Sequence, residues 1–409
     1  MAAQIEIIRS SLFSIRKRND AIHLKSVKPE HDKKRVLKEI EKRIAARSIT
    51  DDAQTERCYW GSSVQLVEDD NWNCTIDGID MYDGNAGTAL FYTVLYKKTG
   101  KEEYREKAAQ TIAPILAAIK ESDEQFNTGF LKGVGGFLAV LYEMRGYCIS
   151  VKKADEAIDA ILAKEDLNSE EDDFVLGNAG YLAALSKAYS IEKSPKRKIK
   201  ILEVAEKYAD IITGRICFEQ SGFAHGINGI IPYIYRFYKL LRKPEYLEYV
   251  ISAIEYERIH YFNKKDEDWR CGMENGNYAY AWCHGSPGIL LGKLMLAKQG
   301  FKDALLEKEM TVAKDNLLKK GLGHGLCLCH GDLGNAMIYK AWAKECGNIY
   351  DLKRLNKIEE SLLGCLLDGT WDNEEKSCNR FNGLMIGLSG IGLFLATLGC
   401  ETTLTDMLL

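Results

Sequence analysis

The sequence contains little that would interrupt a helix and almost nothing that predicts a sheet. Among 409 residues there are only six prolines, and the alternation of apolar and polar residues that marks half-buried strands is almost absent. No apolar run reaches the length of about 18 residues that a membrane-spanning helix needs. The best of them, Ile289 to Gly292, ends at Lys293. These absences exclude a β-rich fold and a membrane span, and they predict an all-α protein.

Two further absences concern targeting and charge. The N-terminus, Met1 to Asp20, lacks the apolar core and small-residue cleavage site of a secretory signal. The formal net charge is 55 − 59 = −4, which is too close to neutral to indicate binding to nucleic acid or to a membrane surface. We therefore expect a cytoplasmic protein whose 12 cysteines are reduced and form no disulfide framework.

What the sequence does contain is a glycine pattern that recurs along most of the chain. Its Gly-x-x-Gly segments recur at intervals of about 50 residues, which is the spacing of a repeat architecture. Each segment leads into a helix that is apolar nearly all round, such as Thr88 to Tyr96, and such a helix must be buried on most sides. The seven segments begin at Gly84, Gly133, Gly177, Gly226, Gly285, Gly331 and Gly387.

A second, more amphipathic helix follows most of these inner helices, as in Glu102 to Lys120, Pro195 to Ile212 and Lys353 to Leu367. The seventh inner helix, Ile391 to Leu398, has only a short tail after it, and the amphipathic segment Asp32 to Arg47 is the candidate for its outer partner. We therefore predict an α/α toroid of seven helical-hairpin repeats over residues 51–409. Residues 1–50 form an N-terminal helical segment that closes the ring.

A closed ring would gather the N-termini of the seven inner helices at one end of the barrel. Helix N-termini carry partial positive charge and free N–H groups, which stabilise anions such as a thiolate or an enolate. His225, His284 and His330 each immediately precede a Gly-x-x-Gly turn and therefore belong to this end. We predict that the active site lies there.

Two thiols accompany these histidines, because Cys283-His284 and Cys329-His330 occupy equivalent positions of adjacent repeats. Cys283, Cys329 and His330 together supply three N/S ligands, which is what a zinc site with an open fourth position requires. The pattern leaves the exact set open. Cys327 and His324 are nearby, and His284 could replace His330. The structural alternative is a pair of buried cysteines with hydrogen-bonding histidines.

These motifs resemble those of the lanthionine synthetase C family of lanthipeptide cyclases, most of all the cyclase portion of class II bifunctional synthetases. The resemblance rests on Trp282 to Gly288, on Leu328 to Asn335, on Ala224-His225-Gly226 and on Met81 to Phe91, within sevenfold Gly-x-x-Gly repeats. It covers residues 50–405 and implies an α/α toroid, in agreement with the glycine period.

The resemblance also implies roles for single residues. Zinc would be held by Cys283, Cys329 and His330, while His225 would perform acid/base chemistry, oriented by Asp173. His284 follows the first zinc cysteine, where the family has Tyr or His, and is the second candidate for the acid. One position departs from the family: Ala279 stands where single-function cyclases carry an arginine, which leaves the enolate-stabilising role unassigned.

The implied function is zinc-dependent formation of lanthionine or methyllanthionine rings. A peptide cysteine thiolate adds to a dehydroalanine or dehydrobutyrine of the same peptide, and an acid then protonates the α-carbon. The expected partners are a dehydrated precursor peptide with its leader and a dehydratase domain or protein, because the chain itself lacks a dehydratase region. One alternative is a family member that binds zinc and glutathione, or another protein, without cyclising. Another is a glycoside-active α/α barrel, which would need a pair of carboxylates.

Overall fold

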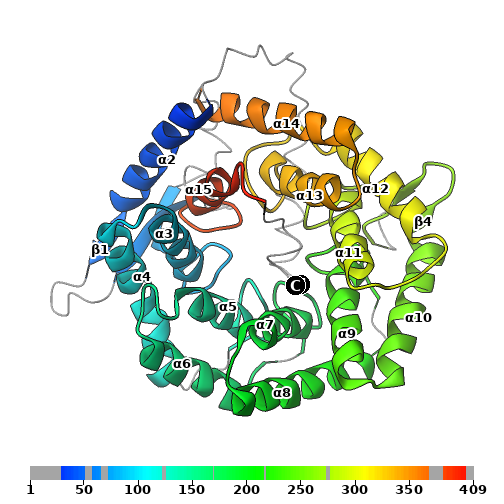
Figure 1. Ribbon diagram of the computed structural model, residues 1–409, viewed down its shortest axis with the longest axis horizontal. Coiled ribbons are helices and arrows are strands. Elements are labelled where there is room, and N and C mark those ends of the chain that lie inside the picture. The colour runs from blue at the N-terminus through cyan, green and yellow to red at the C-terminus, as the bar shows by residue number, and fades with distance from the viewer. Residues whose placement is uncertain are drawn as a thin grey trace.

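The computed structural model consists of two concentric rings of helices (Figure 1). It describes residues 29–50, 58–65, 72–121, 126–168, 170–215, 218–272, 277–367 and 381–401. The inner ring contains α3 (Asn85–Thr99), α5 (Val134–Met144), α7 (Asn178–Ile191), α9 (Ile227–Leu241), α11 (Ser286–Lys298), α13 (Asp332–Glu345) and α15 (Leu388–Thr397). The outer ring contains α2 (Pro29–Ala45), α4 (Glu102–Glu121), α6 (Val151–Ala163), α8 (Pro195–Thr213), α10 (Pro244–His260), α12 (Leu306–Lys320) and α14 (Ile349–Leu367).

The inner ring is closed. Each inner helix packs against the next, and α15 packs against α3. The α/α toroid predicted from the glycine period is therefore confirmed. Every inner helix also packs against an outer one, and α15, which no outer helix follows among the described residues, packs against α2. There the ammonium of Lys33 donates a hydrogen bond to the backbone oxygen of Leu398 at 2.8 Å. Residues 1–28 of the predicted N-terminal segment lie outside the described residues.

The Gly-x-x-Gly segments are the first turns of the inner helices. In all seven repeats the first glycine is the residue that caps the helix N-terminus. A Cβ atom added to either glycine of a segment would overlap with the backbone six residues earlier, as Gly229 does with the Phe223 oxygen. Glycine is needed because the preceding loop folds back directly onto the helix start.

These loops are joined into a closed circle of seven backbone hydrogen bonds. The residue two positions before the first glycine of each repeat, which we call the circle residue, donates its N–H to the backbone oxygen of the circle residue in the next repeat. The donor–acceptor distances are 2.8–3.3 Å. The last bond, from Met385 to Tyr82, joins the seventh repeat to the first. In chain order the circle residues are Tyr82, Leu131, Val175, Ala224, Cys283, Cys329 and Met385.

The all-α prediction missed a small antiparallel sheet. Strands β1 (Ser48–Thr50), β2 (Cys58–Gln65) and β3 (Trp72–Ile76) pair in that order. The strands are short, and β2 contains Gly61 and two serines, so the sequence shows no clear apolar alternation. The sheet is fixed by its contacts, since Trp60 is buried and stacks on Tyr92 of α3 with ring centroids 5.8 Å apart. A second two-stranded pair joins β4 (Phe262–Asn263) to β5 (Asp268–Trp269).

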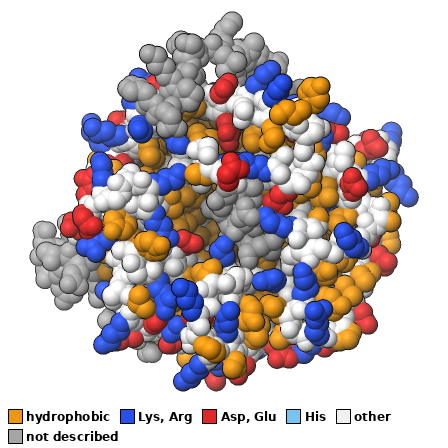
Figure 2. Space-filling model, in the orientation of Figure 1, with side chains coloured by type: hydrophobic (Ala, Val, Ile, Leu, Met, Phe, Trp, Pro, Cys, Tyr) orange, Lys and Arg blue, Asp and Glu red, His pale blue; other side chains and the backbone are white. Residues whose placement is uncertain are grey.

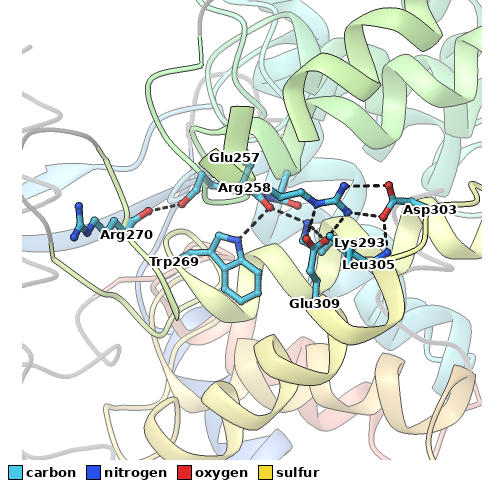
Figure 3. Close-up of polar contacts among 10 residues, drawn as sticks. Glu257, Arg258, Trp269, Arg270, Lys293, Asp303, Leu305 and Glu309 are labelled. Atoms are coloured by element: carbon cyan, nitrogen blue, oxygen red, sulfur yellow. Dashed lines mark hydrogen bonds and ion pairs between the residues drawn. The ribbon is translucent and has the colours of Figure 1, made fainter. Parts of the chain in front are cut away.

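A buried ionic network links α10, α11 and α12 (Figure 3). Lys293 of α11 lies 2.8 Å from Glu257 of α10 and 2.9 Å from Glu309 of α12, and the Lys293 and Glu257 side chains are each 1% exposed. Arg258 joins the network through Glu309 and Asp303. Lys293 directly follows the apolar run Ile289 to Gly292, and its partners explain how a charge is tolerated there. No helix of the described residues is both long and apolar enough to cross a membrane.

Candidate functional site

The predicted site residues lie on the loops that form the circle, at the N-terminal ends of the inner helices. Cys283 and Cys329 are adjacent circle residues, and the N–H of Cys283 donates to the backbone oxygen of Cys329 at 3.3 Å. The residue after each circle residue, which we call the mouth residue, is a histidine in three consecutive repeats. The circle and mouth residues together form one end of the inner ring, which we call the rim. The repeat thus places both thiols and three imidazoles, those of His225, His284 and His330, around one part of this rim.

The two thiols share a hydrogen bond. Both side chains are almost fully buried, with 3% of Cys283 and 2% of Cys329 exposed. The hydrogen bond from Cys283 lowers the pKa of Cys329 to about 6, with further help from His330. The same bond, together with burial, raises the pKa of Cys283 well above its ordinary value. Cys329 is therefore the sulfur that loses its proton first, in the range that suits a metal ligand at neutral pH.

His330 stands beside the same sulfur. Its pKa is raised well above the ordinary value, first by the electrostatic attraction of Cys327 and then, against the cost of burial, by hydrogen bonds to Cys327 and Cys329. Cys327 is itself 4% exposed. His324 is directed elsewhere, because its ring nitrogen Nε2 lies 2.6 Å from the backbone oxygen of Lys320. The structure therefore keeps Cys327 near the site and removes His324 from it.

The donor types suit zinc. Two cysteines and one histidine in mutual contact match the ligands of a zinc site that keeps one open position. Within the residues that the structure describes, no three His, Cys, Asp or Glu side chains are already arranged to enclose a metal ion. The ligands would therefore have to reorient when an ion binds.

A histidine–carboxylate pair lies next to the thiols. Nδ1 of His225 lies 2.8 Å from an oxygen of Asp173, and the two side chains are 11% and 8% exposed. Burial lowers the pKa of His225, but the hydrogen bond and charge of Asp173 outweigh it, so the net pKa is raised. Because Asp173 occupies Nδ1, the other ring nitrogen, Nε2, remains to exchange protons.

The pKa of His284 is shifted in the opposite direction to that of His225. Its ring stacks on that of His225 with centroids 5.7 Å apart. Burial, followed by repulsion from His225 and His330, lowers the pKa of His284 to about 4, so this ring is neutral at physiological pH. Its Nε2 atom is buried, and no described residue forms a hydrogen bond with it. Two stacked imidazoles whose pKa values are pushed apart suit different roles in proton transfer.

An apolar layer lies directly beside the site. The residue before each circle residue is large and apolar, and four of these side chains, Phe130, Phe174, Phe223 and Trp282, have ring centroids 4.9–6.1 Å apart. Except for Phe223, the residues of this layer line a cavity of about 400 Å³ that Lys98 and Lys187 also line. Figure 2 shows one face of the molecule, where hydrophobic side chains gather in a central hollow with Lys and Arg side chains around it.

Four rim residues, Tyr82, Lys132, Asp80 and Asp83, were given no role by the sequence analysis. The hydroxyl of Tyr82 donates a hydrogen bond to Sγ of Cys329 at 3.1 Å. The ammonium of Lys132 pairs with Asp80 at 3.1 Å and also with Asp83. A signal for them was present, because Tyr82 precedes its Gly-x-x-Gly turn by the same two residues as Cys283 and Cys329. Aligning the seven turns would have placed Tyr82 in the circle and Lys132 among the mouth residues.

Comparison with known sequences gives the family. The family model described as Lanthionine synthetase C-like protein matches residues 75–409. Glutathione S-transferase LANCL1 of Danio rerio is 26% identical over an alignment of 302 residues that covers 64% of this chain and 69% of that protein. Lacticin 481/lactococcin biosynthesis protein LcnDR2 of Lactococcus lactis subsp. lactis is 25% identical over 245 residues, 54% of this chain and 24% of that protein.

Solved structures agree on the fold. Nisin cyclase aligns with a TM-score of 0.63 and 18% identity, over 81% of this chain and 92% of its own. A variant of unsaturated glucuronyl hydrolase from Streptococcus agalactiae aligns with a TM-score of 0.50 and 11% identity, over 95% of this chain and 98% of its own. At these identities the likenesses show the fold alone. Since the family model covers most of the chain, the protein belongs to the lanthionine synthetase C-like family.

Proposed function

We propose that this protein is a zinc-dependent cyclase that forms thioether rings in a dehydrated precursor peptide. Cys283, Cys329 and His330 would hold the zinc ion. When bound, the ion supplies a Lewis acid that keeps a coordinated thiol deprotonated at neutral pH. Family membership and the similarity to LcnDR2, whose name refers to lacticin 481 biosynthesis, support the substrate class.

The protein's own residues supply the proton transfers. In its neutral form His225 accepts the proton of the incoming peptide thiol at Nε2, because Asp173 occupies Nδ1. The thiolate sulfur then forms a bond to the β-carbon of the dehydroamino acid, and the π electron pair moves to the carbonyl oxygen, giving an enolate. His225, now protonated, returns a proton to the α-carbon and restores the carbonyl. His284 is the second candidate for this acid.

The observation that carries the proposal is the juxtaposition of two unlike groups at one rim. One group is a pair of thiols, of which Cys329 has a pKa of about 6. The other is a buried imidazole held in one orientation by a carboxylate. Thiol activation and α-carbon protonation are the two demands of the reaction. The thiols would supply metal ligands for the first, and the imidazole would carry the proton in both.

A reconstituted reaction tests this function. The purified protein is incubated with zinc and a synthetic peptide that contains one cysteine and one dehydroalanine, with and without a leader sequence. We expect the free thiol to disappear without a change in peptide mass, because ring closure is an isomerisation. A thiol that persists at the rate of a protein-free control would contradict the proposal. The leader-dependent difference in rate tests whether the partner is a leader-bearing precursor, and adding a dehydratase tests for the second partner.

Glutathione binding is the second candidate function, because this chain is similar to Glutathione S-transferase LANCL1 over 69% of that protein's length. The same site would then activate the thiol of glutathione and direct it to an electrophile in another molecule. The two functions separate in one competition assay. A cyclase closes the peptide ring in the presence of glutathione, while a transferase yields an adduct whose mass is higher by one glutathione.

The glycoside-active alternative finds no support at the rim. The similarity to the glucuronyl hydrolase shows the fold alone, and a glycosidase needs two carboxylates around a sugar bond. Among the described rim carboxylates, Asp80 and Asp83 are instead both paired with Lys132, and Asp173 is paired with His225.

A further inference from the structure

Tyr82 reaches the thiol site from another part of the ring. It is the circle residue of the first repeat, while Cys329 is that of the sixth, and their hydroxyl and sulfur atoms are 3.1 Å apart. This contact joins residues 247 positions apart in the sequence. The hydroxyl therefore lies beside the sulfur that is assigned to the metal, and beside the place where a substrate thiol would be held.

The backbone of Tyr82 is fixed on both sides. Its N–H lies 2.8 Å from Oδ1 of Asp80 and 3.0 Å from the backbone oxygen of Leu131. Its own oxygen accepts the hydrogen bond from Met385 that closes the circle. A residue held in this way loses little further entropy when it takes part in a reaction.

The ring of Tyr82 is held as well. The ammonium of Lys132 lies 5.2 Å from its centroid, a distance at which a cation is attracted to an aromatic face. Lys132 is in turn anchored by Asp80 and Asp83. A tyrosine hydroxyl, whose pKa is ordinarily about 10, is a neutral donor at physiological pH.

The proposed addition needs such a donor. When the sulfur bonds to the β-carbon, the π electrons move to the carbonyl oxygen, and an oxyanion develops there before the α-carbon is protonated. Ala279 stands where a cation was expected and contributes no charge. His225 is engaged with Asp173 through one nitrogen and with the proton transfers through the other.

We propose that Tyr82 is a catalytic residue whose hydroxyl turns from Sγ of Cys329 and donates its single hydrogen bond to the enolate oxygen formed during thiol addition. This inference rests on the proposed cyclase function. A donor aimed at the developing oxyanion acts mainly on kcat, because the charge is absent in the ground state. Loss of one such donor lowers kcat by about 10²- to 10³-fold.

The test compares Tyr82→Phe with Tyr246→Phe in the peptide cyclisation assay. Tyr246 is a matched control, because its hydroxyl also makes a hydrogen bond, to Asp210 at 2.6 Å, but between outer helices. We expect Tyr82→Phe to lower kcat about 10²-fold with little change in KM, and Tyr246→Phe to retain kcat. Zinc affinity, measured by competition with a chromophoric chelator, should be nearly unchanged in both variants.

The outcomes separate the inference from the function on which it rests. A wild-type protein that closes no ring refutes the proposed function, and with it this inference. An active wild type with an unchanged kcat in Tyr82→Phe refutes the inference alone. If Tyr82→Phe weakens zinc binding and a saturating zinc concentration restores kcat, Tyr82 only positions Cys329, and the inference is again wrong.

A second variant covers the case in which Tyr82→Phe does not fold, as judged by its circular dichroism spectrum. Lys132→Met keeps the hydroxyl and removes the cation that holds the ring. We expect kcat to fall less than about tenfold and KM to be retained, since the donor remains but is held less firmly. An unchanged kcat would overturn the arrangement proposed for Tyr82.

Discussion

Two aspartates at the rim each bind a side chain of the next repeat. The two pairs occupy the same positions of the repeat but differ in the partner, which is a lysine in one pair and a histidine in the other. Asp80 and Asp173 both stand four residues before the first glycine of their repeats. Each accepts a hydrogen bond at Oδ1 from the backbone N–H of its own mouth residue, at 3.1 and 2.6 Å. Each then binds, at Oδ2, the mouth residue of the next repeat, Lys132 at 3.1 Å and His225 at 2.8 Å.

The comparison shows that the repeat fixes where the paired side chains lie, while the identity of the partner side chain determines whether the pair can transfer a proton. An imidazole titrates near neutral pH, so the Asp173–His225 pair can accept and return a proton. Burial lowers the pKa of Lys132, but Asp80 and Asp83 outweigh it and raise the net pKa, so this ammonium keeps its proton. In the proposed mechanism the Asp173–His225 pair serves the proton transfers, while the Asp80–Lys132 pair anchors the loop that carries Tyr82.

The largest effect should follow from breaking the imidazole pair. We expect His225→Gln to lower kcat for cyclisation by about 10²- to 10⁴-fold, because the general acid–base group is lost. Zinc content should stay unchanged, since His225 is not a ligand in this account. Lys132→Met, at the equivalent position of the other pair, should cost far less. Equal losses in the two variants would show that the pairs do not differ in function.

A third ionic group, away from the rim, sharpens the comparison. Lys293→Met would leave Glu257 and Glu309 buried with one cation fewer (Figure 3). We expect the free energy of unfolding to fall by about 3–5 kcal/mol, since an uncompensated buried charge remains. The part that stays folded should retain the kcat of the wild type. Denaturant unfolding measures the first effect and the peptide assay the second. A variant as stable as the wild type would show that the network contributes little.

The pH dependence distinguishes the two carboxylates. Asp173 holds the pKa of His225 above its ordinary value, so Asp173→Asn should lower that pKa. Since the acid must be protonated to act, the alkaline limb of the pH–kcat profile should move to lower pH, with a loss in kcat of about tenfold or more at neutral pH. Asp80→Asn should leave the alkaline limb of the pH–kcat profile at the same pH as in the wild type.

The same pair contributes to stability with a definite sign. The raised pKa of His225 means that its contribution is fully present below the unfolded histidine pKa of about 6.5 and is lost as pH rises through the folded value. The stability difference between wild type and Asp173→Asn should therefore shrink toward alkaline pH. A difference that grows with pH would contradict the assigned direction.

The smallest effect concerns the closure of the ring, on which both pairs depend. Lys33→Met removes the hydrogen bond from α2 to the Leu398 oxygen near the end of α15. We expect a loss of about 1 kcal/mol in the free energy of unfolding, which is typical of one partly exposed hydrogen bond. Hydrogen exchange should report the loss first in α15. Deleting the N-terminal segment as a whole should destabilise the last repeat, and an intact last repeat would count against its role in closure.

Much of the fold could be predicted from the sequence because every repeat carries a Gly-x-x-Gly segment. Each loop folds back onto a helix start, and only glycine leaves room for that contact, so the seven turns are visible without a structure. The strands β1 to β3 were missed because they depend on contacts with α3, such as Trp60 on Tyr92, and carry little pattern of their own.

The sequence predicted those contacts of the site that join the same position of adjacent repeats. It did not predict contacts between repeats that are not adjacent. Cys283 and Cys329 stand at the same place in adjacent repeats, so their proximity follows from the period. The contact between Tyr82 and Cys329 depends on the diameter of the ring and the reach of one side chain, which no spacing reveals. The state of His284 depends on burial and on two neighbouring imidazoles, and that too required the assembled rim.

The central claim is that the rim holds zinc through Cys283, Cys329 and His330, and the metal content of the purified protein tests it most directly. We predict about one zinc ion per chain in the wild type, as in a site with one open position. Cys283→Ala and Cys329→Ala should each lose it, while Cys346→Ala, which removes an exposed thiol, should retain it. A wild type without zinc, or zinc that persists in both site variants, would contradict the assigned ligands and the mechanism built on them.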